Sequence, residues 1–276
     1  MKALFKLTWN AIKIAWRTPI AFFFVLLFPI GLFFVYAGIF AHGRPDVVLL
    51  YFGPILTLMA LTNGPFGNGA MTVMMRERGM LRPYHLTPLT AWQWALSRML
   101  SNYLLSLAVG ALMYAIARGV YHMPFPASLF DLWVIYTLGS FAIASVGMIV
   151  ASIMNNMQES PIVFQLLFLV FLFFSGASIR FAHLPPFFRG FGRFLPPTLM
   201  ILAYNALVEH HTPLVRLWPE LLGLVTTGGL CFAIGSLLFR WEKEQRATRR
   251  ERFLALLAFL PMMAMGIWLN GFLGSR

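Results

Sequence analysis

The sequence predicts an all-α protein embedded in a membrane, and three properties of its composition support this fold class. Hydrophobic residues make up 59% of the 276 residues, and the mean hydropathy is +0.76. Only 11% of the residues are charged, against roughly 25% in soluble domains. Several apolar runs reach the length of about 20 residues that a helix needs to cross a bilayer. These properties exclude an ordinary soluble enzyme, a coiled coil and a disordered chain.

Seven apolar runs are expected to form helices in the membrane. The first is longer than the apolar part of a signal peptide, so we expect it to be retained. The second is too long for one straight crossing and is interrupted by a run rich in glycine and asparagine at residues 63–69. We expect the first six runs to form one membrane domain over residues 20–240 and the last to be an additional span. The runs are residues 20–41, 47–75, 99–117, 132–154, 162–179, 221–239 and 253–273.

The distribution of positive charge predicts the orientation of these spans. Lys and Arg number 21 against 9 Asp and Glu, which gives a net charge of +12. Most of the basic residues lie in residues 2–17, 76–98 and 240–252, and the positive-inside rule places these segments in the cytoplasm. The N-terminus is then cytoplasmic and residues 180–218 face outward. Since the basic residues alternate with apolar runs instead of forming one patch, nucleic-acid binding is not expected.

Both ends of the chain carry segments outside the six-span domain. Residues 1–18 place their cations on one arc of a helical wheel, which is typical of an amphipathic helix lying on anionic lipid. Residues 241–252 are expected to form a charged cytoplasmic linker. Pro261 and Gly266 fall within residues 253–273, so an interfacial or re-entrant segment is the alternative to a seventh span there.

Motifs for catalysis and for metal binding are missing from the sequence. It contains no G-x-x-x-x-G-K-[ST] loop for nucleotide phosphates, no H-E-x-x-H and no G-x-S-x-G. Cys231 is the single cysteine, so no disulfide can form within the chain. We therefore predict no catalytic residue, no metal site and no cofactor in this chain. No span carries a charged residue near its middle, which disfavours a carrier that titrates its own side chains.

The most specific motif lies between the second and third apolar runs. There, Arg76-Glu77-Arg78-Gly79-Met80-Leu81 is followed by Leu86-Thr87-Pro88-Leu89. This segment resembles the R-E-x-G-T-L-x-x-L-x-x-T-P-like motif of the permease subunits of bacterial type-2 ABC exporters, with Met80 where the family usually has Thr. By order and spacing of elements the resemblance covers about residues 1–240. It implies a six-span permease bundle of the bacterial inner membrane that neither binds nor hydrolyses ATP itself.

The resemblance implies that residues 76–89 couple the permease to its ATPase. Gly79 can end the helix that leaves the second span, and Pro88 restricts the chain before the third. We expect Leu81, Tyr84 and Leu86 to form an apolar wedge surrounded by charge, which is the composition of a small docking surface. A positively charged loop without a partner is the alternative. The expected coupling residues are Arg76, Glu77, Arg78, Gly79, Leu81, Arg82, Pro83, Tyr84, Leu86, Thr87 and Pro88.

A second resemblance lies after the fifth span. The family ends that span with a Ser-Gly step and continues with an L-P-x-x-[LF]-R segment that re-enters the outer leaflet, where protein must shield the broken helices. We therefore expect a re-entrant segment over residues 180–218. The sequence departs from the pattern at residues 179–181 and 197–200, so an irregular outer loop is the alternative. The expected outer gate consists of Ser175, Gly176, Leu184, Pro185 and Pro186.

The transport pathway of the family runs between two permease copies along the first, second and fifth spans. The corresponding residues here are Phe23, Phe24, Phe28, Asn63, Asn68, Gln165, Phe168 and Phe171. An aromatic wall with a few amides fits an amphipathic or lipid-like substrate. The alternatives are lipid contact or helix packing for the phenylalanines and hydrogen bonds between helices for the amides.

The resemblance also implies the partners. Two copies of an ATPase subunit would bind the ATP and Mg, and a second permease copy or a sister permease would complete the membrane part, with lipids around it. The phenylalanine-rich first span after Trp16-Arg17-Thr18-Pro19 favours export of a drug, lipid or glycolipid. A permease for polysaccharide or lipid-linked glycan is the alternative within this class. Outside the class, the alternatives are a membrane-embedded lipid-modifying enzyme and a non-transporting anchor.

Overall fold

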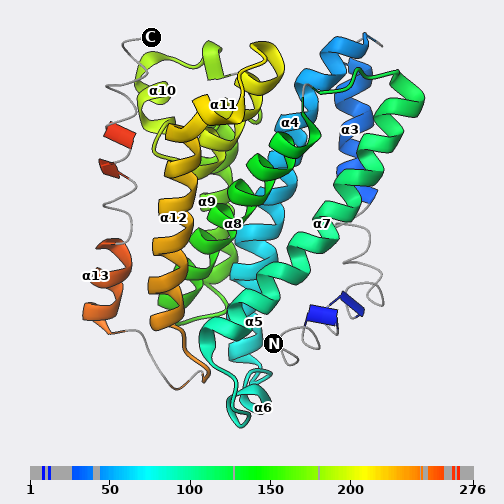
Figure 1. Ribbon diagram of the computed structural model, residues 1–276. Helices are drawn as coiled ribbons and strands as arrows, with labels where there is room; N and C mark the ends of the chain where they lie inside the picture. Colours follow the sequence, from blue (N-terminus) through cyan, green and yellow to red (C-terminus); the bar gives the residue numbers. More distant parts are fainter. Residues whose placement is uncertain are drawn as a thin grey trace.

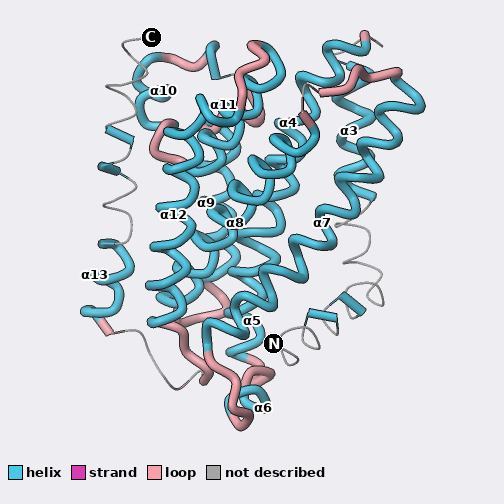
Figure 2. The backbone as a smooth tube through the Cα atoms, viewed as in Figure 1, coloured by secondary structure: helices cyan, strands magenta, loops and turns pink. Residues whose placement is uncertain are grey.

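All secondary structure that this computed structural model describes is helical (Figure 2), which confirms the predicted all-α fold class. The described residues are 8–9, 12–13, 27–39, 44–126, 128–179, 181–242, 244, 248–257, 263–264 and 266–267. The long helices lie side by side, with α6 at one end of the bundle and α10 at the opposite end (Figure 1). In chain order the elements are α3 (Phe28–Ile39), α4 (Pro45–Leu61), η2 (Thr62–Ala70), α5 (Met71–Glu77), α6 (Arg82–His85), α7 (Ala91–Tyr121), α8 (Leu129–Ile153), α9 (Ser160–Phe174), η3 (Phe181–His183), α10 (Pro186–Gly192), α11 (Pro196–Glu209), η4 (Leu214–Leu217), α12 (Trp218–Leu237) and α13 (Arg249–Leu257).

Four continuous helical stretches are long and apolar enough to cross a membrane, and they correspond to the second, third, fourth and sixth predicted spans. They are Pro45–Glu77, Ala91–Tyr121, Leu129–Ile153 and Leu214–Leu237. In the predicted fifth span, α9 has 15 residues, or about 22 Å at 1.5 Å per residue, which is short of a hydrocarbon core of about 30 Å. The first part of the predicted first span, with Phe23 and Phe24, lies outside the described residues. The count of six spans stays a prediction.

The second predicted span is helical throughout, and this differs from the expected interruption at residues 63–69. The helices α4, η2 and α5 form one stretch of 33 residues, in which η2 is a π-helix of nine residues. A π-helix pairs each N–H with the carbonyl five residues earlier, and its turn is therefore wider than that of an α-helix. The wider turn accommodates Pro65, whose ring would clash with a carbonyl inside an α-helix.

Glycines let the backbone of η2 pack directly on its neighbours. A Cβ atom on Gly147 of α8 would lie 2.7 Å from the carbonyl oxygen of Gly64, and one on Gly69 would lie 2.4 Å from the ring of Phe164 on α9. Small residues at helix contacts allow such close approach inside membranes, where packing and not water drives association. The π-helical segment is therefore held between α8 and α9.

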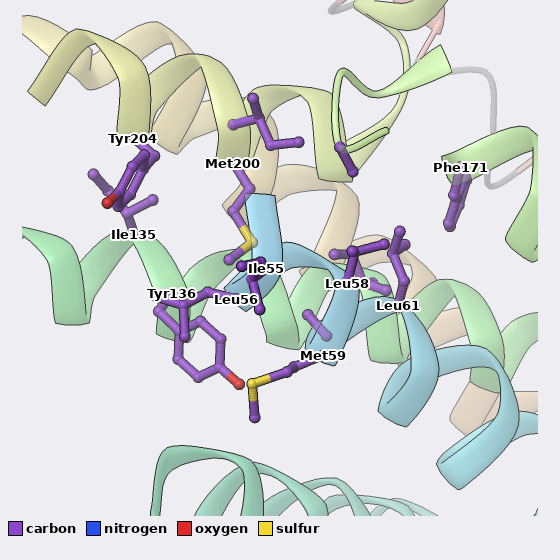
Figure 3. Packing of buried hydrophobic residues seen from close by; sticks show 14 of the residues in the cluster. Ile55, Leu56, Leu58, Met59, Leu61, Ile135, Tyr136, Phe171, Met200 and Tyr204 are labelled. Atoms are coloured by element: carbon purple, nitrogen blue, oxygen red, sulfur yellow. The ribbon is translucent and has the colours of Figure 1, made fainter. Parts of the chain in front are cut away.

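The largest buried cluster surrounds α4 and α8, and α11 packs against both helices. Met200 of α11 points toward Ile55 of α4 in Figure 3. Glycines again provide the space, because a Cβ atom on Gly53 would lie 2.1 Å from the ring of Tyr204, and one on Gly139 would lie 2.5 Å from the sulfur of Met200. The segment that contains α11, which the sequence predicts to re-enter the membrane, is thus part of the core.

The segments at the two ends of the chain are described only in part. Of residues 1–18, Thr8 is buried and its hydroxyl donates a 3.5 Å hydrogen bond to the Ser97 carbonyl of α7. Residues 8–9 and 12–13 are helical, and the Lys13 Nζ lies 5.7 Å from the centroid of the Trp9 ring. The rest of the predicted interfacial helix lies outside the described residues. Within the predicted linker 241–252, α13 begins at a capping box in which the Thr248 amide donates to a Glu251 carboxylate oxygen at 2.7 Å. That hydrogen bond lowers the pKa of Glu251.

The predicted seventh span, residues 253–273, lies largely outside the described residues and stays a prediction. Its first part belongs to α13, which lies beside α12 (Figure 1) and buries Ala255. Farther along, Gly266 contacts Phe194, because a Cβ atom there would lie 2.0 Å from the ring. Phe194 follows α10, at the end of the bundle opposite α6.

The glycine contact between η2 and α8 yields a first prediction. We expect Gly147→Ala to lower the thermal unfolding temperature in detergent, because its methyl group must displace the η2 backbone, an overpacking cost of about 1–3 kcal/mol. Gly229→Ala on α12 is the matched control, since nothing lies within 4 Å of a Cβ atom at that position. Equal unfolding temperatures for the two variants would contradict the described contact.

Candidate functional site

The predicted coupling segment begins at a helix stop that uses glycine as the sequence suggests. Gly79 has a φ of +69°, a conformation that side chains disfavour. Its amide donates to the Arg76 carbonyl at 3.0 Å, and the Met80 amide donates to the Met75 carbonyl at 2.9 Å. This pair of hydrogen bonds is a Schellman motif, which satisfies the last carbonyls of α5. The chain therefore leaves the bundle in one fixed direction and forms the short helix α6.

The loop around α6 exposes some of the predicted coupling residues and buries others. Leu86 is 89% exposed, and the half-exposed Met80 is the second large apolar side chain there. Leu81 is fully buried against Trp94 and so lies beneath the surface instead of in the expected wedge. Arg76 is likewise buried, whereas Glu77, Gly79 and Tyr84 are half-buried. The exposed predicted residues are Arg78, Arg82, Pro83, Leu86, Thr87 and Pro88.

A segment far away in the sequence lies against this loop. We call residues 239–242 and Glu244, which follow α12, the strap. Trp241 stacks on His85 with ring centroids 5.7 Å apart, and Glu242 lies 3.6 Å from the same imidazole. Glu244 pairs with Arg82 at 3.4 Å, although both side chains are more than half exposed, so this ion pair adds little stability. From the sequence, residues 239–240 are expected to end the six-span domain and residues 241–252 to form a linker. Aromatic and acidic residues opposite a basic loop were a usable signal for the strap.

Two buried arginines hold the end of α8 beneath the loop and the strap. Arg76 donates to the carbonyls of Ala151, at 3.2 Å, and Met154. Arg240 donates to the carbonyls of Ser152 and Met154, both at 2.8 Å. The side chains are 1% and 7% exposed, respectively. Carbonyls at the end of a helix lack partners within the helix and carry partial negative charge, so guanidinium groups are suitable partners. From the sequence, Arg76 is expected to be a coupling residue, whereas Arg240 counts only as a marker of orientation.

The predicted pathway residues that the structure describes do not all line one space. Asn63 and Asn68 line one small cavity, whereas Phe168 lines another. Asn68 is buried, where its side-chain oxygen accepts a 2.8 Å hydrogen bond from Asn102 of α7 and its amide donates to the Asn63 carbonyl at 3.1 Å. The first hydrogen bond joins η2 to α7, and the second lies within η2. Phe171 is buried in the core, whereas Gln165 is exposed on α9. The side chain of Phe28, like Phe23 and Phe24, lies outside the described part of the chain.

An apolar hollow of about 290 Å³ lies between α3, α4 and α9, and Phe168 is the predicted pathway residue that lines it. The helices around it are those of the predicted first, second and fifth spans. Of this lining only Phe168 is among the pathway residues expected from the sequence, since an apolar residue facing a hollow and one facing lipid look alike in sequence. The lining residues are Pro29, Leu32, Tyr36, Ile55, Leu58, Met59, Thr62, Phe168, Leu172 and Ser178.

The first two residues of the predicted outer gate, Ser175 and Gly176, form a tight turn at the end of α9. Ser175 is buried and its hydroxyl accepts a 3.2 Å hydrogen bond from the Ala177 amide, while Gly176 has a φ of +91°. Leu184 is buried, but Pro185 and Pro186 are exposed at the start of α10. The following helix, α11, is fixed to α4 by the Tyr204 hydroxyl, which donates to the Leu49 carbonyl at 2.6 Å.

The Tyr204 hydrogen bond yields a second prediction. We expect Tyr204→Phe to destabilise the protein by about 1 kcal/mol, the size measured for hydrogen bonds between membrane helices. Tyr114→Phe is the control, because the Tyr114 hydroxyl is buried with no hydrogen-bond partner among the described residues. Unfolding in a detergent titration measures both variants. A loss for Tyr114→Phe as large as that for Tyr204→Phe would contradict the assignment.

Comparison with known proteins identifies relatives of this chain. Residues 2–208, about three quarters of the chain, match the ABC-2 type transporter family. Similar proteins are the inner membrane transport permease YhhJ of Escherichia coli strain K12 and the protein of the same name of Shigella flexneri. Each is 24% identical over 173 residues, which is 62% of this chain and 46% of the relative. The chain thus spans about half the length of these curated relatives.

Proposed function

This chain belongs to the ABC-2 type transporter family, and from this membership we propose that it is the membrane-spanning permease subunit of an ATP-driven exporter of amphipathic or lipid-like molecules. The observation that carries the proposal is the loop around α6, a fixed and partly apolar surface at one end of a membrane bundle. In this proposal the protein is a multi-pass protein of the bacterial inner membrane, with its N-terminus and the α6 end in the cytoplasm.

The surface around α6 has the properties of a docking site for a separate ATPase subunit. Leu86 is 89% exposed, and the exposed cations Arg78 and Arg82 lie in the same loop. An apolar centre with a charged rim is a common composition of protein interfaces. The family of this chain supports an ATPase as the partner, and that subunit would bind the ATP and Mg. We propose two ATPase copies, one for each of two permease copies.

The hollow between α3, α4 and α9 supports the proposed class of substrate. Its volume of about 290 Å³ and its mainly apolar lining suit part of an amphipathic molecule. On α9, whose Phe168 and Leu172 line the hollow, Ile162, Leu166 and Phe173 expose large apolar side chains. We propose that this side of the bundle faces the second permease copy and that the substrate passes between the two.

A third prediction tests the docking surface. We expect Leu86→Glu to abolish co-purification of a P-loop ATPase with the tagged protein from its native membranes, since it places a carboxylate in the apolar centre. Val215→Glu is the matched control, because Val215 is 83% exposed, close to the 89% of Leu86, and lies in η4, outside the proposed docking loop. Copurified proteins are identified by mass spectrometry. Loss of the ATPase in both variants, or in neither, would contradict the assignment of the surface.

A fourth prediction tests the substrate class. Export of ethidium, Hoechst 33342 and a fluorescent short-chain phospholipid is compared between cells that express the protein with its ATPase and cells that lack it. We expect export of at least one probe, and we expect Leu172→Trp to reduce it because the larger ring fills the hollow. Leu222→Trp is the control, because Leu222 is 42% exposed on α12 and does not line the hollow. Export of none of the three probes would contradict the substrate class.

A further inference from the structure

We propose that Arg76 and Arg240 are positioning residues of the transport cycle, which pass the movement of the coupling segment through the end of α8 to α9. The two arginines and the carbonyls they hold are called the clamp below. The inference rests on the proposed function, since it concerns how the docking surface reaches the hollow. It adds a role for Arg240, which lies outside the residues that match the family.

The clamp joins three segments that are far apart in the sequence. Arg76 comes from α5, just before the coupling loop, and Arg240 comes from the strap after α12. Both donate to the Met154 carbonyl, and Arg240 also donates to the side-chain oxygen of Asn155 at 2.9 Å. These two acceptors lie just beyond α8, in the short connection 154–159 that leads to α9. Movement of Arg76 therefore acts on the start of α9 through one shared carbonyl.

The contacts of the clamp form a closed ring. Arg76 is fixed to the coupling loop by the Schellman turn at Gly79. The strap, which carries Arg240, contacts α6 through the stacking of Trp241 on His85 and through the ion pair of Glu244 with Arg82. The coupling loop, the end of α8 and the strap are thus each linked to the other two. In such a ring, a force on α6 moves the coupling loop, the end of α8 and the strap together. If one of the three contacts were missing, the segments could move relative to one another.

The hydrogen bonds of the clamp favour arginine over lysine, whereas a cation that only sets the orientation of the protein in the membrane could be either. A solvated lysine or arginine satisfies the positive-inside rule equally well, but both clamp side chains are buried. Burial of a charge is costly unless hydrogen bonds compensate for it. A guanidinium presents several donors in a fixed plane and can bridge two or three carbonyls at once, whereas an ammonium is a point charge on a flexible chain. We therefore expect lysine to replace either arginine poorly.

The path from the clamp ends at the hollow. After the connection 154–159, α9 begins at Ser160 and carries Phe168 and Leu172, two residues of the hollow's wall. Phe164 of the same helix contacts the π-helical segment at Gly69. A shift of the start of α9 therefore changes both the hollow and the packing on η2. This gives the ATPase a route to the substrate space that does not require α4 itself to move.

The test compares distances and coupling in clamp variants. The variants are Arg76→Gln, Arg240→Gln and the milder Arg240→Lys, and Arg98→Gln is the matched control, since Arg98 donates to the η2 carbonyl of Gly67 at 3.3 Å outside the clamp. Spin labels at Pro88→Cys, near but not at the proposed docking centre Leu86, and at Ile162→Cys report the distance between the coupling loop and α9 in the complex with the ATPase. Both positions are exposed. A second pair at Phe187→Cys and Val215→Cys reports the opposite end of the bundle.

We expect the clamp variants to broaden the distance distribution between positions 88 and 162 and to remove its shift on ATP binding. The distribution between positions 187 and 215, and both distributions in the control, should not change. Export of the probe per ATP hydrolysed should fall by about tenfold in Arg240→Gln, a typical size for coupling between sites, while the ATPase stays bound.

Unchanged distance distributions in both Gln variants would overturn the proposal. Equal losses of export and of ATP hydrolysis would also overturn it, because they indicate a purely structural role. If Arg76→Gln does not fold, Arg240→Lys carries the same test. The distance measurement without nucleotide separates this proposal from the proposed function, because it needs neither an ATPase nor a substrate: a broadened distribution there supports the clamp even if no ATPase binds.

Discussion

Backbone polar groups inside a bilayer have no water to bind, so each must find a partner within the protein. The irregular features of this bundle follow from that constraint. The π-helical turn keeps the chain helical across Pro65, and the hydroxyl of Tyr204 binds the carbonyl of Leu49. At the α6 end, where α5 and α8 stop, a Schellman turn and two arginines take the carbonyls that the helices leave unpaired. The hydrogen bonds that these backbone groups require therefore also shape the proposed docking surface around α6.

The same constraint connects the proposed docking surface with the proposed substrate space. The turn at Gly79 fixes the direction in which the coupling loop leaves the bundle, and Arg76 ties that loop to the end of α8. From there the short connection to α9 leads to the hollow between α3, α4 and α9. Close glycine contacts hold η2 between α8 and α9. The parts proposed to bind ATPase and substrate are thus mechanically linked through backbone carbonyls and not through charged pairs within the membrane.

Much of the fold could be predicted from the sequence, because length and hydropathy are properties of single segments. The all-α class and the helix stop at Gly79 follow from such local signals. The sequence did not predict that η2 continues as a helix, since glycine and proline usually end one. Nor did it predict the burial of Leu81 or the clamp, because these depend on pairing residues 76 and 240 through a third segment. An arginine in a loop looks the same whether water or a carbonyl surrounds it.

We propose, centrally, that an ATPase subunit binds the loop around α6 and transmits its movement to the bundle there. This proposal is tested most directly by a photoreactive amino acid at position 86, irradiated in native membranes that contain the whole assembly. This account predicts a covalent adduct with a P-loop ATPase from position 86 and none from position 215, in η4. An ATPase adduct from position 215 with none from position 86 would contradict it.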